Sequence, residues 1–376
     1  MTAATNGLVR TKTRVLVVDD ASIFRRVISD ALSGIPGVEV VGTSANGKLA
    51  LARLASLQPD LVTLDIEMPE MNGIEVLEAI QNSGVNTNVI MLSSCTVRGG
   101  DMTIRALELG AFDFITKPEG GAQEANMARL RDSLRPMIQA LERRREIRAI
   151  LSVKGSKLAP AAALNHSPQP LAPAAVRAPG RSGPPIVLIG VSTGGPAALA
   201  EVLPVFPAKI GAPVFIVQHM PPHFTEALAN RLRSKSAILV KEAQDGEIAR
   251  ADCAYLAPGG KQMKLSPGKN GEILIRITDD PPENACRPSV DYLFRSVALH
   301  FPGRSIAAIL TGMGNDGTEG MRMLKRGGSV NIAQDEATCV VFGMPREAIL
   351  AGVVDTVVPL SKIATAIVRA IAEARV

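Results

Sequence analysis

Three residues in the second half of the chain have the side chains that nucleophilic acyl transfer needs. Ser192 follows the apolar run 186–189 in a glycine-rich turn, and His219 and Asp316 each follow a further apolar run. Because the carboxyl ends of parallel strands gather at one edge of a sheet, we expect these side chains to meet there. The serine would attack an acyl carbon, the histidine would accept its proton, and the aspartate would orient the imidazole. The glycine loops would supply backbone N–H groups for an oxyanion.

Ser192 also has simpler interpretations. The segment Gly190-Val191-Ser192-Thr193-Gly194 matches the pattern G-x-S-x-G, which is weak evidence by itself. A lone serine after a strand is usually a helix N-cap. The chain order serine, histidine, aspartate also differs from that of α/β-hydrolases. A dinucleotide-binding loop is disfavoured, because Ser192 stands where G-x-G-x-x-G has its middle glycine.

A second group of polar residues follows the apolar runs of the first third of the chain: Asp19, Asp20, Asp65, Ser93 and Lys117. Three carboxylates at one sheet edge repel one another unless a cation lies among them, and Mg²⁺ prefers such oxygen ligands. A carboxylate can also accept a phosphoryl group. The lysine would balance charge, and the serine would hydrogen-bond a phosphoryl oxygen.

Strands and helices alternate in both regions, as the positioning of these groups requires. β-Branched apolar runs separated by helix-length segments predict a small doubly wound parallel sheet with strands at 15–18, 38–41, 61–64, 89–92 and 112–116. The second region predicts another α/β domain with strands at 186–189, 214–217, 306–310 and 330–333, and hairpin material at 273–277. Its expected helices cover 196–205, 223–233, 289–300 and 318–326.

The segment between the two domains changes character along its length. Residues 122–150 predict one charged, amphipathic helix that Pro136 kinks or restarts. Residues 152–185 are rich in Pro and Ala, which predicts a flexible linker. The expected organisation is a first domain, a helical extension with linker, and a second domain at 13–130, 131–185 and 186–376.

Composition limits the classes of function. Apolar residues make up 46% of the 376 residues, which excludes disorder throughout. Aromatic residues are only 3%, which argues against base-stacking platforms, and the net charge of +5 is concentrated between residues 129 and 148 without a recognition motif. We therefore expect no nucleic-acid partner; an acidic protein partner would suit the basic stretch equally well.

The cysteines and the apolar runs indicate a location. The four cysteines are scattered without a C-x-x-C pair, so neither disulfides nor a zinc site is suggested, and a reducing cytoplasm fits. No apolar segment has the form of a signal peptide or the length of a membrane span, so we expect no membrane insertion.

The acidic cluster closely resembles the receiver domain of response regulators. The motifs that carry the resemblance are Asp19-Asp20, Asp65 with Met68-Pro69, Ser93, and Lys117-Pro118. The resemblance implies a flavodoxin-like fold and phosphorylation of Asp65 by a partner histidine kinase. It also implies Mg²⁺ held at Asp19, Asp20 and Asp65 with help from the Glu67 carbonyl.

Three further receiver residues are implied as a switch: Ser93, Phe114 and Lys117. Ser93 stands where threonine is commoner, which is a mild departure from the family pattern. Phe114 takes the place of the switch aromatic, but it lacks the hydroxyl that a tyrosine would offer.

The second region resembles the C-terminal domain of chemotaxis protein-glutamate methylesterases of the CheB type. The resemblance rests on 189–196, 217–222, 257–262, 287–291, 310–317 and 340–348. It implies a Rossmann-like domain with Ser192 as nucleophile, His219 as base and Asp316 as its orienter. It further implies an oxyanion site with backbone help near Met313, with Thr193 lining the site and no cofactor for the esterase.

These expectations combine into one functional hypothesis. The chain would be a phosphorylation-activated serine hydrolase that removes methyl groups from glutamate esters, and deamidates glutamines, on the cytoplasmic helices of methyl-accepting chemoreceptors. The unphosphorylated receiver would cover the face that carries Ser192. The alternative is a response regulator whose second domain binds a ligand or DNA without chemistry, which leaves the three polar residues without a purpose.

Overall fold

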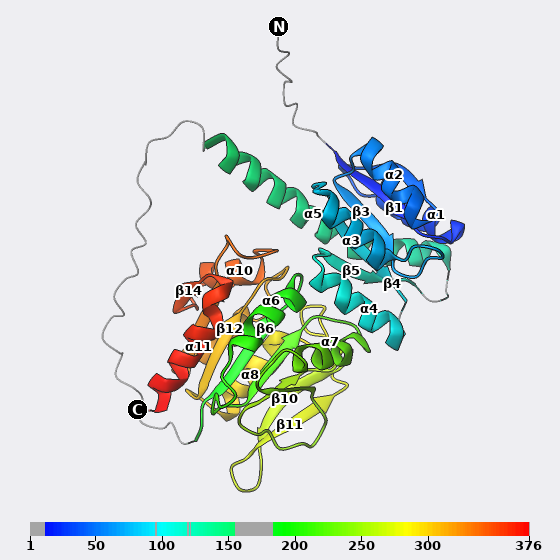
Figure 1. Ribbon diagram of the computed structural model, residues 1–376. Coiled ribbons are helices and arrows are strands. Elements are labelled where there is room, and N and C mark those ends of the chain that lie inside the picture. The colour runs from blue at the N-terminus through cyan, green and yellow to red at the C-terminus, as the bar shows by residue number, and fades with distance from the viewer. Residues whose placement is uncertain (1–11, 95, 119, 121, 155–182, 376) are drawn as a thin grey trace. The chain divides into compact units, whose positions relative to one another are not determined.

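The computed structural model describes residues 12–94, 96–118, 120, 122–154 and 183–375. Contacts divide the chain into two compact units, residues up to Arg143 and residues from Arg144 onward. Each unit is built on a parallel sheet (Figure 1). The predicted fold class is confirmed, while part of the predicted linker, residues 155–182, lies outside the described residues.

The first unit has five parallel strands in the order β2-β1-β3-β4-β5, which is the flavodoxin-like order. The strands are β1 Thr13–Val18, β2 Val38–Ser44, β3 Leu61–Asp65, β4 Asn88–Ser93 and β5 Asp113–Thr116. The helices are α1 Ser22–Ser33, α2 Gly47–Leu57, α3 Gly73–Ser83, α4 Val97–Glu108 and α5 Gln123–Lys154. All five predicted strands are present, and β3 is buried at every position, as expected for a strand covered by helices on both faces.

Local sequence fixes helix α3 against the end of β3. Asn72 accepts a hydrogen bond from the Glu75 amide (3.0 Å) while the Glu75 carboxylate accepts one from the Asn72 amide (2.8 Å), which forms a capping box. A Cβ at Gly73 would lie 2.2 Å from the Asp65 carbonyl oxygen, so only glycine allows this approach. The start of α3 therefore holds the backbone of Asp65 in place.

Helix α5 continues through Pro136 as a single helix. Leu130, Leu134, Ile138 and Leu141 are buried on its inner face, at the spacing of one helical stripe. These side chains explain why the first unit extends to Arg143.

The second unit has seven parallel strands in the order β14-β13-β12-β6-β7-β9-β8, and a separate antiparallel hairpin, β10-β11. Its strands are β6 Ile186–Val191, β7 Val214–Gln218, β8 Leu239–Glu242, β9 Cys253–Leu256, β10 Gln262–Pro267, β11 Ile273–Thr278, β12 Ser305–Ile309, β13 Val330–Gln334 and β14 Thr356–Val358. Its helices are α6 Gly195–Val202, η1 Leu203–Val205, α7 Phe224–Arg233, α8 Val290–His300, α9 Thr318–Arg326, α10 Met344–Leu350 and α11 Leu360–Arg375.

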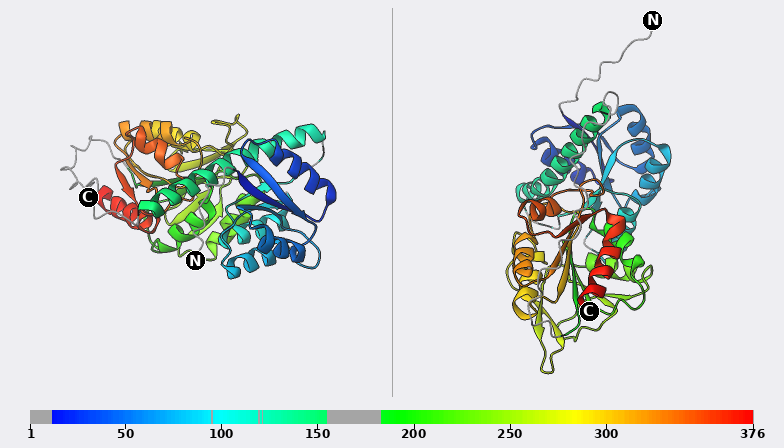
Figure 2. Two further views of the ribbon diagram at one scale, coloured as in Figure 1. Left: turned by 90° about the horizontal axis from the view of Figure 1, so that it is seen from above. Right: turned by 90° about the vertical axis from the view of Figure 1, so that its left-hand side faces the viewer.

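Helices cover both faces of this larger sheet. The right-hand view of Figure 2 shows α11 and α6 on one face and the yellow-to-orange helices α8 to α10 on the other. The core between these layers is largely aliphatic, as the scarcity of aromatic residues predicts, although Phe215, Phe294 and Phe301 are buried in it. The chain order reverses at β6, because β7 lies on one side of it and β12 on the other. Ligands bind at such switch points in open α/β sheets.

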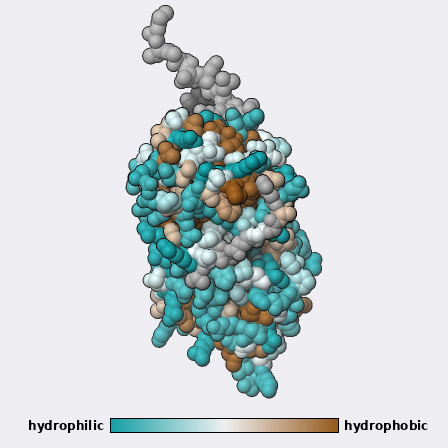
Figure 3. Space-filling model, turned by 90° about the vertical axis from the view of Figure 1, so that its right-hand side faces the viewer, coloured by the Kyte–Doolittle hydropathy of each residue, from teal (hydrophilic) through white to brown (hydrophobic). Residues whose placement is uncertain are grey.

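One face of the molecule is mostly polar (Figure 3). On the face shown in Figure 3, small hydrophobic patches lie within a largely hydrophilic surface. No helix in the described part of the chain is both long enough and apolar enough to cross a membrane.

Candidate active site and phosphorylation site

The structure places Ser192, His219 and Asp316 at the carboxyl edge of the larger sheet. Ser192 follows β6 and His219 follows β7. The two strands pair with Val191 opposite Gln218, and the His219 amide donates to the Val191 carbonyl (3.1 Å). Asp316 follows β12 and lies in the loop before α9. The predicted convergence at the switch point is therefore present in the backbone.

The turn after β6 needs its glycines. Gly194 has φ +76°, in the left-handed region that favours glycine, and α6 begins at the next residue. A Cβ at Gly312 would lie 2.7 Å from the Ser192 Cβ. Close backbone packing thus sets the position of Ser192, which is half-buried.

Both nitrogens of the His219 ring have a side-chain partner. Its Nε2 and the Asp316 Oδ2 are 2.8 Å apart, and only 14% of the His219 side chain is exposed. Its Nδ1 lies 3.6 Å from the Cys286 sulfur. Among the described residues no hydrogen bond joins the Ser192 hydroxyl to the ring. Because Asp316 occupies Nε2, Nδ1 is the nitrogen that remains to accept a proton.

Asp316 is the most highly coordinated carboxylate of the site. Oδ2 accepts from the Val290 amide (2.7 Å) as well as from His219. Oδ1 accepts from the Ser289 hydroxyl (2.9 Å), the Asn284 side chain (2.9 Å) and the Asp291 amide (3.0 Å). Two of these amides belong to the first turn of α8, where the helix dipole favours a negative charge.

These contacts set the protonation of the pair. Burial raises the pKa of Asp316, but the hydrogen bond with His219 and those from Asn284 and Val290 outweigh it and lower the pKa to about 2. Burial lowers the pKa of His219, but the contacts with Asp316 and Cys286 outweigh it and raise the pKa to about 9. Asp316 therefore stays ionised and stabilises the protonated imidazole.

Backbone N–H groups near Ser192 are available for an oxyanion. Within the described residues, the amides of Thr193, Gly194 and Met313 donate no hydrogen bond. The first two precede α6, and Met313 lies in the glycine loop after β12. Thr193 is buried, and its carbonyl accepts from the Thr311 hydroxyl (2.9 Å).

Three residues that contact His219 or Asp316 were not predicted from the sequence. Asn284 and Ser289 donate to Asp316, and Cys286 contacts His219. Ser289 was expected only as the start of a helix, and it does cap α8. Asn284 and Cys286 belong to a turn before α8 in which Asn284 and Ala285 have positive φ. A left-handed asparagine in a loop has a weak sequence signal, since many turns use one.

The first unit gathers its charged residues at the carboxyl ends of β1, β3 and β5. The Lys117 ammonium lies 2.8 Å from Asp19 Oδ2 and 2.7 Å from Asp65 Oδ2. Asp19 and Asp65 are buried, whereas Asp20 is exposed. Burial is the main reason that the pKa of Asp65 is raised to about 6, although Lys117 lowers it.

The carboxylates fit a divalent cation. One oxygen of each of Asp19, Asp20 and Asp65 lies within 4.8 Å of the others. Within the described residues, the Oδ2 atoms of Asp19 and Asp65 have only the Lys117 ammonium as partner. Hard oxygen donors with spare lone pairs suit Mg²⁺.

Of the predicted switch residues, Ser93 belongs to β4, Phe114 belongs to β5, and Lys117 follows β5. The Ser93 hydroxyl is buried and points to α4, where it accepts from Thr103 (2.8 Å) and lies 3.4 Å from the Gly99 carbonyl oxygen. Phe114 is buried on β5. The Lys117 ammonium lies 4.9 Å from the centre of the Phe24 ring. Lys117 thus joins the acidic cluster, while Ser93 is hydrogen-bonded to α4.

Two family models match separate parts of the chain. Residues 15–129 match the response regulator receiver domain family, and residues 187–367 match the CheB methylesterase family. The catalytic domain of Thermotoga maritima CheB methylesterase is 42% identical, covers 50% of this chain and 99% of its own, and has a TM-score of 0.49.

Relatives that match over the whole chain share one description. A Desulfotalea psychrophila protein described as protein-glutamate methylesterase/protein-glutamine glutaminase is 51% identical over 95% of this chain and 98% of its own. A Bacillus subtilis protein of the same description is 41% identical over 96% of this chain and 99% of its own. The chain therefore belongs to the CheB family of receiver-linked protein-glutamate methylesterase/protein-glutamine glutaminases.

Proposed function

We propose that this protein hydrolyses glutamate γ-methyl esters on chemoreceptor cytoplasmic helices, releasing methanol, and that it deamidates glutamines by the same acyl chemistry. The observation that carries the proposal is the Asp316–His219 pair, which leaves Nδ1 as the ring nitrogen that can take the proton of Ser192, the residue that follows the neighbouring strand β6. Family membership supports this hydrolytic function over a second domain that only binds a ligand or DNA.

The first chemical step transfers the acyl group of the substrate to Ser192. Ser192 Oγ attacks the ester carbonyl carbon, His219 Nδ1 takes the hydroxyl proton, and the carbonyl oxygen becomes an oxyanion. The amides of Thr193, Gly194 and Met313, which donate no other hydrogen bond within the described residues, would donate to it. Collapse of the intermediate expels methanol, which takes the proton from His219, and leaves an acyl-enzyme.

Water completes the reaction by the reverse proton path. His219 Nδ1 accepts a proton from water as the water attacks the acyl carbon, and it returns this proton to the Ser192 oxygen. A glutamine side chain follows the same course with ammonia as leaving group. Asp316, held by its five donors, keeps the ring oriented throughout.

The receiver supplies the control. Asp65 is the proposed phosphoacceptor, with a histidine kinase as donor. Asp19, Asp20 and Asp65, with the Glu67 carbonyl, would hold Mg²⁺, which neutralises phosphoryl charge when it is bound. Lys117 holds the carboxylates of Asp19 and Asp65 together. Ser93 would have to leave Thr103 in order to reach a phosphoryl group, which couples phosphorylation to α4.

The decisive experiment is methanol release from a methylated receptor by the full chain and by Ser192→Ala. We expect the variant to lose about 10³-fold or more in rate. Ser234→Ala, which removes an exposed serine hydroxyl, is the matched control. Equal methanol release by Ser192→Ala and the unmodified chain would overturn the proposal.

A further inference from the structure

A thiol lies beside Nδ1, the nitrogen of His219 that does not contact Asp316. The Cys286 sulfur lies 3.6 Å from His219 Nδ1, and both residues are only partly exposed. No step of the hydrolysis uses this sulfur. The turn that carries the sulfur is nevertheless held by several hydrogen bonds and an ion pair.

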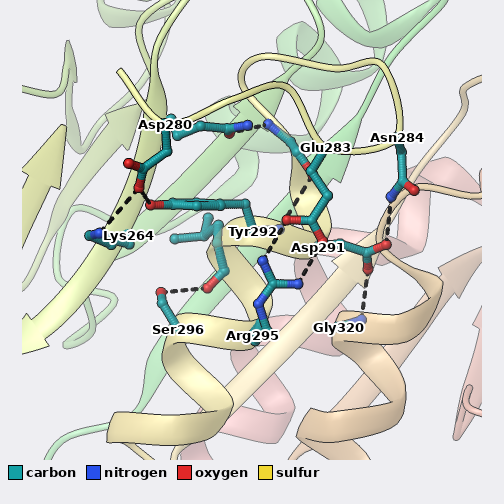
Figure 4. Close-up of polar contacts among 12 residues, drawn as sticks. Lys264, Asp280, Glu283, Asn284, Asp291, Tyr292, Arg295, Ser296 and Gly320 are labelled. Carbon is teal, nitrogen blue, oxygen red and sulfur yellow. Dashed lines mark hydrogen bonds and ion pairs between the residues drawn. The ribbon is translucent and has the colours of Figure 1, made fainter. Parts of the chain in front are cut away.

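The turn that carries Cys286 is fastened from several sides. Glu283 and Cys286 exchange two backbone hydrogen bonds (3.1 and 2.8 Å). Glu283 forms a two-pronged ion pair with Arg295 of α8, with its closest nitrogen–oxygen distances at 2.6 and 2.5 Å. Asn284 donates to both Asp291 and Asp316. Figure 4 shows Glu283 in contact with Arg295 and Asn284 in contact with Asp291, both of which are residues of α8.

The separation of the sulfur and the nitrogen suits a shared metal ion. Tetrahedral zinc takes a thiolate at about 2.3 Å and an imidazole nitrogen at about 2.0 Å, which places those two atoms about 3.5 Å apart. The observed distance is 3.6 Å. Both ligands could therefore bind one ion with little movement.

Asp316 completes this arrangement in the way that metal sites commonly do. A histidine ligand usually donates its other ring nitrogen to a carboxylate, which fixes the tautomer and makes the ligand more basic. Here His219 Nε2 contacts Asp316, so the lone pair of the neutral ring points to the side of Cys286. Asp316 already accepts five hydrogen bonds, so it acts as the partner of the ligand rather than as a ligand.

We propose that Cys286 and His219 Nδ1 form a binding site for a zinc-class divalent cation, and that the ion reversibly inhibits the hydrolase. This inference rests on the proposed function, because the ion takes the lone pair that must accept the Ser192 proton. Binding releases the thiol proton to solvent, and water fills the remaining coordination positions. The enzyme would then be active only where free zinc is scarce.

The activity test uses the full chain with saturating Mg²⁺ and buffered free Zn²⁺. We expect zinc to reduce methanol release and a chelator to restore it. Cys286→Ser should raise the inhibition constant at least tenfold, since even outer-shell changes cost about 10–100-fold in metal affinity. Cys339→Ser is the control, because burial raises the pKa of that thiol and it lies outside the cluster of His219, Cys286 and Asp316. Each variant is compared with its own zinc-free rate.

A binding test without turnover separates this inference from the proposed function. Co²⁺ added to the full chain should produce a thiolate-to-cobalt charge-transfer band in the near ultraviolet. The band should remain in Ser192→Ala and Cys339→Ser, and should vanish in Cys286→Ser and His219→Gln. A band that survives Cys286→Ser, or its absence from the unmodified chain, would overturn the metal site even if the esterase is confirmed. Equal zinc inhibition of Cys286→Ser and the unmodified chain would overturn the inhibition.

Discussion

Asp316 and Asp65 are both buried carboxylates, one in the loop after β12 and the other at the end of β3, but their surroundings differ. Asp316 accepts five hydrogen bonds, and its pKa is lowered to about 2 in spite of burial. Asp65 has the Lys117 ammonium and one long contact from the Glu67 amide (3.3 Å), and burial raises its pKa to about 6.

This difference separates two chemical uses of one residue type. A carboxylate that is saturated with donors stays ionised and fixed, which suits an orienting partner. A carboxylate with spare lone pairs can bind a cation and attack phosphorus. The fold supplies the same sheet edge in both units, so the number of donors around each aspartate decides its use.

The largest effect should come from Asp316→Asn. An asparagine amide can donate to Nε2, which moves the ring proton to Nδ1 and removes the lone pair needed by Ser192. We expect kcat to fall by about 10³- to 10⁴-fold. Asp291→Asn is the matched control, since Asp291 shares Asn284 but does not contact His219. Comparable losses in both variants would show that Asp316 has no special relation to the ring.

The pH dependence of kcat/KM should report the raised pKa of His219. The neutral ring accepts the proton, so kcat/KM should fall about tenfold per pH unit as the pH drops below the raised pKa of about 9. The charged or titratable groups that face the ring are Asp316 and Cys286, with Asp291 beyond them. Cys286→Ser removes one group that raises the pKa of His219. The fall in kcat/KM of this variant should therefore begin at a lower pH than in the unmodified chain. In the unmodified chain, a fall that begins only at the ordinary value of 6.5 would contradict the prediction.

Asp65→Asn tests the other carboxylate. We expect the increase in methanol release that a small-molecule phosphodonor and Mg²⁺ produce in the full chain to disappear, because an amide cannot form the acyl phosphate. The measurement is the ratio of rates with and without phosphodonor. Asp30→Asn, an exposed acidic residue of α1, is the control. Persistent activation in Asp65→Asn would place the phosphoacceptor elsewhere.

A smaller loss of kcat is expected when one hydrogen-bond donor to Asp316 is removed. Asn284→Ala removes one of its five donors and leaves two carboxylates facing each other without their shared amide. Loss of such a hydrogen bond to a charged group costs about 1–3 kcal/mol, so kcat should fall about tenfold. Asn270→Ala, in the exposed hairpin turn, is the control. An unchanged kcat would mean that donor number does not matter.

The sequence was sufficient to predict the elements that place both sites. Strand-long apolar runs that end in Ser192, His219 and Asp65 correspond to β6, β7 and β3. Burial on both faces makes such strands uniformly apolar, so their ends can be recognised. Short strands such as β14, with only three residues, have too little pattern to be distinguished from a turn.

The contacts that tune the sites were not predictable. The Ser93 hydroxyl accepts a hydrogen bond from Thr103 on α4, and no pattern in the sequence indicates that partner. Asn284 reaches Asp316 across 32 residues of sequence through a turn with positive φ. Such contacts depend on loop conformations that are set by tertiary packing, and one sequence carries little local information about them.

The orientation of the His219 ring has a consequence for chemical labelling. In the chymotrypsin arrangement the nitrogen that accepts the nucleophile's proton is Nε2, whereas here Asp316 contacts Nε2 and the mechanism proposed above uses Nδ1. An electrophilic ester mimic seated over Ser192 would therefore alkylate the nitrogen nearer to the backbone. The resulting Nδ1-substituted histidine is a different regioisomer, so reagents shaped for chymotrypsin-like hydrolases would approach this ring from an unsuitable side.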